Sequence, residues 1–375
     1  MAITRRAFLP VCGAALAGAC GERGTAGFTG LAFVANQAGK AIAVVDLTAF
    51  AVMRHIPLDA APAQLVTHAD RATVYALSPE AGTVHEIAAD QLRVGRQARL
   101  GAKAHSLRFA KDASALWGLC AEERLLVRLP LDGFRPDVRV TLPGSPVDMD
   151  VALDDSFSAG HAAVSLSGTG QVLLMDLQGG SRRLIKVGGQ LGKVRFRKDG
   201  RQLLIASLDD NQVIIYDLAA DRLSVRLPLA VRPDFFCMNE DGGQLFVTGV
   251  GQDALVTVYP YQTEVGGTVL AGRSPGFLAA SSGPDYLFIA NSKSDDVTIV
   301  NIRTQRVMAV AAVGKDPCFI AVTPDNQYAL VLNRGSGDMA VLHVWTLGAN
   351  RTRSASMFTM VPVGSEPVSA VVRKL

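Results

Sequence analysis

Short apolar runs separated by small and polar turn residues fill most of the chain, and the clearest example starts at Pro275. There the runs FLAAS, YLFIAN, VTIVNI and RVMAVAAV follow one another, and the pattern starts again 42 residues later at Pro317. Runs of this length that are rich in Val, Ile and Phe and bounded by Gly, Asp and Asn are typical of short strands. The unit predicts four strands, and no part of it has a convincing helical period.

The same unit recurs along the chain when the proline, or the residue in its place, is used as an anchor. The anchors are Pro62, Ala104, Pro146, Leu191, Pro233, Pro275, Pro317 and Pro367, with successive spacings of 42, 42, 45, 42, 42, 42 and 50 residues. Most anchors are followed eight residues later by an Asp, which suits a turn between two strands because its carboxylate bonds the backbone ahead of it. Gly283 takes the place of this Asp in one unit.

Four strands repeated at this period predict an all-β fold, an eight-bladed β-propeller of four-stranded antiparallel blades. The last anchor supplies only a first strand, EPVSAVVRKL, whereas LAFVANQ, AIAVVDL and VMRHIPL near the other end supply a second, third and fourth. We therefore expect one composite blade built from both ends of the chain. Closing the ring in this way removes exposed strand edges. Seven blades is the alternative count.

The first nineteen residues do not fit the repeat. TRRAFL carries Arg5 and Arg6, and the apolar run after it ends in three small residues before Cys20. This pattern predicts a secretory signal that is too short to span a membrane as a helix, and its arginine pair resembles the twin-arginine export signal. The predicted organisation is a signal peptide at 1–19, a short linker at 20–29 and a single propeller domain at 30–375.

Cleavage before Cys20 has two interpretations. Ala17-Gly18-Ala19 fits ordinary signal peptidase, whereas small residues followed by Cys also resemble a bacterial lipobox, in which Leu normally stands three residues before the Cys. Here Leu16 stands four before it. Lipidation of Cys20 therefore stays open, and it is the one predicted route to a membrane. The expected location is the periplasm or the extracellular space.

Composition excludes one class of partner. Without Arg5 and Arg6 the chain has 35 Lys plus Arg against 34 Asp plus Glu, so no net basic field favours nucleic acid. Beyond the signal region the cysteines are Cys120, Cys237 and Cys318, which fall on blades too far apart for an easy disulfide. We expect three free thiols and a monomer.

The repeat also carries a family resemblance. VAN, IAN and VLN close second strands, VVDL, LMDL and IYDL close third strands, and Gly-x-x-Pro precedes first strands. These motifs resemble the YVTN-type bacterial propeller repeat, which implies an extracytoplasmic propeller of varied or unknown role. The count of eight is similar to the haem d1-binding propellers of cytochrome cd1 nitrite reductase and its relatives, although no Cys-x-x-Cys-His motif for covalent haem is present.

The turn before each first strand is expected beside the mouth of the central channel, so the residue after each anchor is a natural place for a site. Most residues there are small or apolar, and the polar exceptions are His105 and Asp234. An imidazole at the mouth suits a metal ligand or an acid or base near neutral pH. A hydrogen-bonded structural role is the alternative for His105.

The first strands differ around the ring two and four residues after the anchor. Three successive blades carry polar or charged residues there, and the next three carry phenylalanine at the first of these positions: Ser106 and Arg108, Asp148 and Asp150, Lys193 and Arg195, then Phe235, Phe277 and Phe319. Ion pairs between blades are one interpretation, since buried charges need partners. An amphiphilic ligand pocket is the other, and it makes Arg108, Asp148, Asp150, Lys193 and Arg195 candidate binding residues beside His105 and Asp234.

No catalytic motif accompanies these residues. The remaining histidines have no metal-ligand spacing, and no nucleophile elbow, phosphate loop or His-Glu-x-x-His appears. The sequence therefore predicts an exported, non-catalytic scaffold that binds a protein partner or a small ligand at the channel mouth. The alternative is a propeller enzyme or cofactor handler, lactonase-like or of the haem d1 type. The cofactor, if any, and the ligand stay unidentified.

Overall fold

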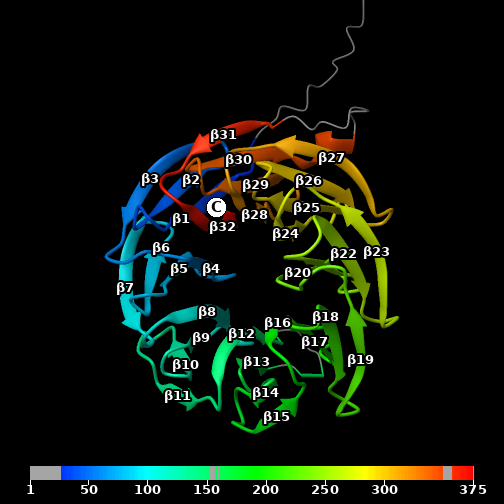
Figure 1. The fold of residues 1–375 in the computed structure, drawn as a ribbon. Coiled ribbons are helices and arrows are strands. Elements are labelled where there is room, and N and C mark those ends of the chain that lie inside the picture. The colour runs from blue at the N-terminus through cyan, green and yellow to red at the C-terminus, as the bar shows by residue number, and fades with distance from the viewer. Residues whose placement is uncertain (1–26, 153–156, 159, 349–356, 375) are drawn as a thin grey trace, which may run out of the picture.

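The strands of the protein form a closed ring of eight four-stranded antiparallel sheets (Figure 1). The computed structural model describes residues 27–152, 157–158, 160–348 and 357–374. The predicted signal region, Cys20 and the repeat residue Asp154 lie outside these ranges. Each sheet is one blade, so the structure confirms the all-β propeller and the count of eight rather than seven.

We number the blades from the one that holds both ends of the described chain, and list their strands from the axis outward. Blade 1 contains β32 (Pro367–Lys374), β1 (Gly30–Asn36), β2 (Ala41–Asp46) and β3 (Ala51–Pro57). Blade 2 contains β4 (Gln64–Thr67), β5 (Thr73–Ser78), β6 (Thr83–Ala88) and β7 (Arg93–Arg99). Blade 3 contains β8 (Ala104–Phe109), β9 (Ala115–Cys120), β10 (Leu125–Pro130) and β11 (Val138–Thr141). Blade 4 contains β12 (Ser145–Val151), β13 (His161–Ser167), β14 (Gln171–Asp176) and β15 (Arg182–Lys186).

The second half of the ring repeats this order. Blade 5 contains β16 (Leu191–Phe196), β17 (Gln202–Ser207), β18 (Gln212–Asp217) and β19 (Arg222–Pro228). Blade 6 contains β20 (Phe235–Met238), β21 (Leu245–Thr248), β22 (Ala254–Tyr259) and β23 (Glu264–Leu270). Blade 7 contains β24 (Pro275–Ala280), β25 (Tyr286–Asn291), β26 (Asp296–Asn301) and β27 (Arg306–Ala312). Blade 8 contains β28 (Pro317–Val322), β29 (Tyr328–Asn333), β30 (Asp338–His343) and β31 (Thr359–Pro362), with a 3₁₀ turn η1 (Val344–Gly348) after β30.

The composite blade closes the ring as predicted. β32 pairs antiparallel with β1, with Ala370 opposite Val34 and Val372 opposite Ala32. Ala370 is buried in a core shared by blades 1 and 8. Phe28, which precedes the predicted start of the domain, is buried in the same core. The pairing of the two ends leaves no unpaired strand edge at this seam.

The core lies between blades rather than in one central mass. β25 and β29 are buried at all six positions, because each faces a neighbouring sheet on both sides. Phe288 of blade 7, for example, shares a cluster with Val331 of blade 8. A sheet covered on both faces needs successive apolar residues rather than strict alternation, which explains why the runs in the sequence are apolar throughout.

The Gly-x-x-Pro element has a steric cause. In blade 8, Asn333 Nδ2 donates to Asp338 Oδ1 at 2.7 Å, and the loop containing Gly314 lies directly against this pair. A Cβ on Gly314 would come within 2.7 Å of Asp338 Oδ1 and 2.3 Å of Ser336 Oγ. Glycine is therefore required by close approach of the loop, which links the repeated Gly to the repeated Asn.

The repeated Asp forms the predicted turn in several blades. Asp199 Oδ1 accepts a hydrogen bond from the backbone N–H of Arg201 at 3.0 Å, and Asp241 Oδ1 accepts one from Gly243 at 2.7 Å. In blade 2 a histidine takes over this task, because His68 Nδ1 accepts from the backbone N–H of Asp70 at 3.0 Å. These contacts satisfy turn N–H groups that have no strand partner.

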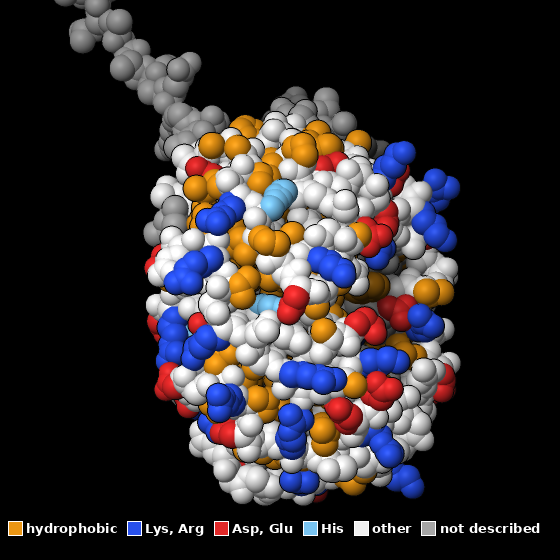
Figure 2. All heavy atoms as spheres, turned by 90° about the vertical axis from the view of Figure 1, so that its left-hand side faces the viewer, with side chains coloured by type: hydrophobic (Ala, Val, Ile, Leu, Met, Phe, Trp, Pro, Cys, Tyr) orange, Lys and Arg blue, Asp and Glu red, His pale blue; other side chains and the backbone are white. Residues whose placement is uncertain are grey.

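The outer wall of the ring is polar and mixed in charge. Figure 2 shows the side of the molecule around β3 and β7, where basic and acidic side chains are interspersed with apolar ones. Most residues of these two outer strands are exposed. Within the described ranges, no helix has the length and apolar character that crossing a membrane requires.

Candidate functional site at the inner rim

The first strands β4, β8, β12, β16, β20, β24, β28 and β32 surround the axis of the ring (Figure 1). Their side chains two and four residues after each anchor form an inner rim with two contrasting parts. We call Arg108, Asp148, Asp150, Lys193 and Arg195, on β8, β12 and β16, the charged arc. We call Phe235, Phe277 and Phe319, on β20, β24 and β28, the aromatic arc.

Ion pairs between blades hold the charged arc together. Arg195 Nη1 lies 2.5 Å from Asp148 Oδ2, and Lys193 Nζ lies 3.6 Å from Asp148 Oδ1. On the other side of β12, Arg108 Nε lies 3.8 Å from Asp150 Oδ1. Both carboxylates also accept backbone N–H groups of blade 5, Asp148 from Val194 at 3.2 Å and Asp150 from Phe196 at 2.9 Å.

The two carboxyl groups respond differently to burial. Burial acts to raise the pKa of Asp148, but Arg195, Lys193 and Arg108 together outweigh it and hold that pKa below its ordinary value. Burial raises the pKa of Asp150, and Arg195 and Arg108 offset only part of this effect. The negative charge of Asp148 is therefore better compensated than that of Asp150, because the cations lie closer to Asp148.

The arginines also differ. Burial and then the charge of Arg195 lower the pKa of Arg108. Burial acts in the same direction on Arg195, but Asp148 and Asp150 outweigh it and raise that pKa. Arg195 thus forms the close ion pair of the cluster, whereas Arg108 has a longer and weaker contact with its carboxylate.

The aromatic arc borders a pocket of about 620 Å³. The pocket spans blades 6, 7 and 8 and reaches Val368 of the composite blade, on the side of the ring where the first strands begin. Phe235 and Phe277 line it, and Phe235 is 38% exposed. The rings of Phe277 and Phe319 lie against each other with centroids 4.3 Å apart.

Small residues keep this pocket open. Gly249, Gly251 and Gly276 line it beside the aromatic rings. A Cβ on Gly249 would lie 1.9 Å from the carbonyl oxygen of Arg232 and 2.6 Å from Asp234 Oδ2. Only glycine fits there, because a larger residue would displace the loop that carries Asp234.

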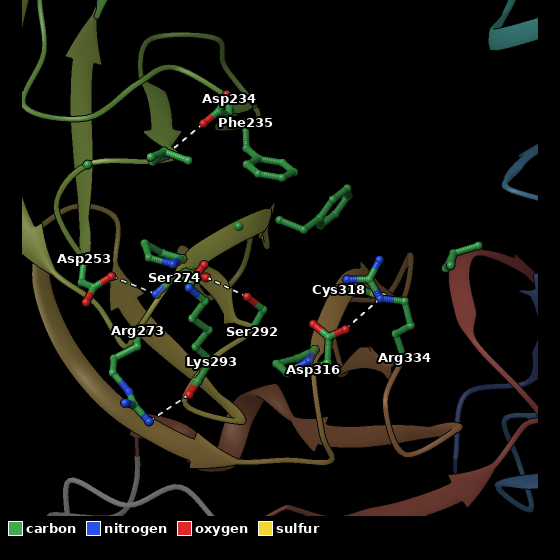
Figure 3. Close-up of a pocket in the computed structure, with 18 residues that line it drawn as sticks. Asp234, Phe235, Asp253, Arg273, Ser274, Ser292, Lys293, Asp316, Cys318 and Arg334 are labelled. Carbon is green, nitrogen blue, oxygen red and sulfur yellow. Dashed lines mark hydrogen bonds and ion pairs between the residues drawn. The ribbon is translucent and has the colours of Figure 1, made fainter.

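Two of the acidic residues at the pocket are already paired. Asp234 accepts from Arg232 Nε at 2.8 Å and from the backbone N–H of Val250 at 2.9 Å. Asp316 Oδ2 lies 2.8 Å from Arg334 Nε, a contact visible in Figure 3. Each of these pairs neutralises its own charge, so neither adds a net charge to the pocket.

The remaining charged groups leave the pocket with a positive excess. Asp253 accepts the backbone N–H of Ser274 at 2.8 Å, and Arg273 Nη2 donates to the carbonyl oxygen of Lys293 at 3.0 Å. In Figure 3 the guanidinium of Arg273 turns away from Phe235, whereas the side chain of Lys293 extends toward Ser274. Among the described residues, the Nζ of Lys293 makes no hydrogen bond or ion pair.

The structure separates the residues that the sequence grouped as site candidates. Asp234 lines the pocket at the aromatic arc, whereas Arg108, Asp148, Lys193 and Arg195 join with Asp150 in the ion-pair cluster. His105 lies on β8, half-buried, and it is not among the residues that line the pocket. Its imidazole makes no hydrogen bond or ion pair with the described part of the chain.

Sequence reasoning missed the polar residues of the pocket. Arg273 and Asp316 occupy the variable positions of Gly-x-x-Pro, and Lys293 and Arg334 follow the Asn that closes a second strand. Both kinds of position recur at the same end of every blade, so the repeat itself was the signal that could have found them.

Within the described ranges, Cys120, Cys237 and Cys318 are free thiols, as predicted. Burial raises the pKa of Cys237 to about 12 and that of Cys318 to about 11. Cys318 lines the pocket and its Sγ donates to the carbonyl oxygen of Pro367 at 3.2 Å. Both thiols stay protonated near neutral pH.

In the described ranges, no group of three His, Cys, Asp or Glu side chains could hold a metal ion.

Comparison with known proteins shows the fold. No protein-family profile and no curated protein matches the sequence. Among solved structures, dihydro-heme d1 dehydrogenase NirN in complex with DHE is similar, with a TM-score of 0.75, 14% identity, and coverage of 92% of this chain and 75% of that one.

Two further structures match over most of both chains. Apo AztD from Citrobacter koseri has a TM-score of 0.69 and 14% identity, with coverage of 91% of this chain and 97% of that one. A protein from Bacteroides fragilis that is assigned as a 6-phosphogluconolactonase has a TM-score of 0.60 and 15% identity, with coverage of 92% of this chain and 98% of that one. These likenesses confirm a propeller, and the YVTN-type resemblance stays a resemblance.

Proposed function

We propose that this protein is an exported, non-catalytic binding protein that takes a small ligand of mixed polarity in the pocket at the aromatic arc. The observation that carries the proposal is the pocket itself, which brings Phe235 and Phe277 from two blades beside Lys293. The exposed ring of Phe235 offers apolar surface for the body of a ligand, and Lys293 offers a charge for an acidic group.

A small ligand suits this site better than a protein partner. The pocket is concave and its volume of about 620 Å³ falls within the range of roughly 300–1,000 Å³ that is usual for small-molecule sites. A stable protein partner would need about 800 Å² of surface on each side. The side chains at the pocket form no nucleophile and base pair, which favours binding over catalysis.

The test uses two fluorescent probes with closely related aromatic bodies, anilinonaphthalene sulfonate and the uncharged N-phenylnaphthylamine. We expect the purified protein to bind both. Phe235→Ala should weaken both probes roughly tenfold, because it removes the exposed apolar surface. Lys293→Gln should weaken only the sulfonate, by roughly threefold, as an exposed charge pair contributes little.

Phe157→Ala is the matched control, since Phe157 is 60% exposed and does not line this pocket. Probe binding that survives Phe235→Ala unchanged, or falls as much in Phe157→Ala, would place the probe elsewhere and contradict the proposal.

Handling of a coloured cofactor is the second candidate. It is supported by the fold match to NirN, whose structure is described in complex with DHE, and by the aromatic surface of the pocket. An absorption spectrum of protein purified from its native host tests this directly. A bound chromophore that is lost in Phe235→Ala would favour cofactor handling over capture of a free ligand.

The exported location rests on the arginine pair before the apolar run. Replacing Arg5 and Arg6 by Lys should retain the precursor in the cytoplasm, because the twin-arginine address depends on arginine rather than on charge alone. Normal amounts of the double variant outside the cytoplasm would contradict twin-arginine export, and mass spectrometry of the mature chain would show whether Cys20 carries a lipid.

A further inference from the structure

The charged arc contains more positive than negative charge. Arg108, Lys193 and Arg195 face only Asp148 and Asp150, and the residues two and four after the anchor in the other five blades are uncharged. The centre of the cluster is withdrawn from solvent, with exposed fractions of 5% for Asp148 and 20% for Arg195, whereas Arg108 is 28% exposed and Lys193 39% exposed at its edge. A surplus positive charge in a partly buried cluster has a desolvation cost, which a bound counterion reduces.

The cations of the charged arc also have unused hydrogen-bond donors. Among the described residues, each arginine uses only Nη1 in hydrogen bonds, Arg108 to the carbonyl oxygen of Leu107 at 2.9 Å and Arg195 to Asp148 and to the carbonyl oxygen of Val194. Lys193 Nζ is 3.6 Å from its nearest carboxylate oxygen, beyond hydrogen-bond distance.

The hydroxyl of Ser106 is a further unused hydrogen-bond donor in this sector. Ser106 stands two residues before Arg108 on β8, at a bulge where its φ is 60°. Its Oγ is buried and has no hydrogen-bond partner among the described residues. A buried hydroxyl normally finds a partner, and a hydroxyl can donate to an anion as the guanidinium groups do.

We propose that the charged arc binds a small oxyanion at the inner rim, held by the unused donors of Arg108 and Arg195 and by Lys193. Planar guanidinium groups match the oxygens of such an anion, and the anion balances the third cation. This site is distinct from the pocket at the aromatic arc and does not depend on the function proposed for that pocket.

The test titrates the full chain with millimolar sodium sulfate at constant low ionic strength and follows thermal unfolding. Binding to the folded state raises the melting temperature with sulfate concentration. Lys193→Gln leaves two cations against two carboxylates and should abolish the rise. Asp150→Asn increases the surplus charge and should move the response to several-fold lower sulfate concentration.

Lys186→Gln is the matched control, because it removes the same charge from the exposed outer strand β15. An equal loss of response in Lys186→Gln would mean that net charge alone is responsible, and would overturn the proposal. So would a wild-type protein without a saturable response, or a Lys193→Gln variant that retains it.

Crystals grown with selenate provide a second measurement that does not depend on the stability of any variant. Selenium scatters anomalously, and the proposal requires a peak between Arg108 and Lys193 in the wild-type protein. Peaks found only at other positions would contradict it.

Discussion

The charged and aromatic arcs occupy equivalent positions on consecutive first strands, yet one is a closed cluster and the other borders an open pocket. On β12 and β16, side chains of opposite sign reach across to each other, as Asp148 and Arg195 do at 2.5 Å. Phenylalanines have no such long-range attraction, and Phe277 packs on Phe319 while Phe235 stays partly exposed. Equivalent backbone positions thus give a network of ion pairs in one sector and an apolar pocket wall in the other.

The small residues sharpen this difference. Gly249 and Gly276 line the pocket at the aromatic arc, whereas the first strands of the charged arc are bridged by hydrogen bonds such as that from the backbone N–H of Phe196 to Asp150 at 2.9 Å. Four experiments test how far the two arcs are independent, and they are ordered by the size of the expected effect.

Removing the strand that joins the two ends of the ring should have the largest effect. Deletion of residues 367–375 takes β32 away from β1 and exposes an unpaired strand edge. The loss should rival the whole stability of a typical domain, about 5–15 kcal/mol. We expect an aggregated or degraded chain. An unchanged melting temperature would show that closure by β32 does not support either arc.

Breaking the ion pair between Asp148 and Arg195 should lower the free energy of unfolding substantially. Asp148→Ala leaves Arg195 without its carboxylate and Val194 N–H without an acceptor. Removing one partner of a buried pair typically costs about 3–5 kcal/mol, measurable by urea unfolding. Binding of the uncharged probe to the folded variant should be unchanged. A parallel loss of probe binding would show that the arcs are coupled.

The two carboxylates should shift the acid dependence of stability in opposite directions. Because folding lowers the pKa of Asp148, its stabilisation is present above its ordinary pKa of 3.8 and is lost as the pH falls through the folded pKa. Because folding raises the pKa of Asp150, its contribution is largest below 3.8 and is lost as the pH rises through the folded value.

Unfolding free energies measured from about pH 3 to about pH 7 should therefore fall less steeply with acid in Asp148→Asn than in the wild-type protein, and more steeply in Asp150→Asn. The same slope in all three proteins would mean that neither carboxylate has a perturbed pKa in the fold.

His105→Ala should have the smallest effect. His105 is half-buried and does not line the pocket at the aromatic arc. Its imidazole takes part in none of the ion pairs of the charged arc and makes no hydrogen bond with the described residues. We expect the unfolding free energy to change by no more than about 0.5 kcal/mol, with both fluorescent probes bound as before. Loss of probe binding in this variant would return His105 to the binding site.

The sequence by itself determined the fold. The period of 42 residues, the Asp turns and the unfinished last unit predicted eight blades and a composite blade, and each is found. This was possible because strands and turns depend on residues that are close together in the sequence. A repeat also shows the same local pattern in many units, so each unit supports the assignment of the others. The division of the first strands into a charged sector and an aromatic sector was also readable, since it depends only on positions relative to the anchors.

The interactions of those side chains could not be read from the sequence. The distances from Asp148 to Arg195 and Lys193 join residues of different blades, and the sequence left both ion pairing and ligand binding open for them. The pocket needed Phe235, Lys293 and Val368, which are far apart in the chain and meet because the ring brings equivalent loops to one face. Non-local geometry sets burial, and burial decides whether a charge is paired or available to a ligand.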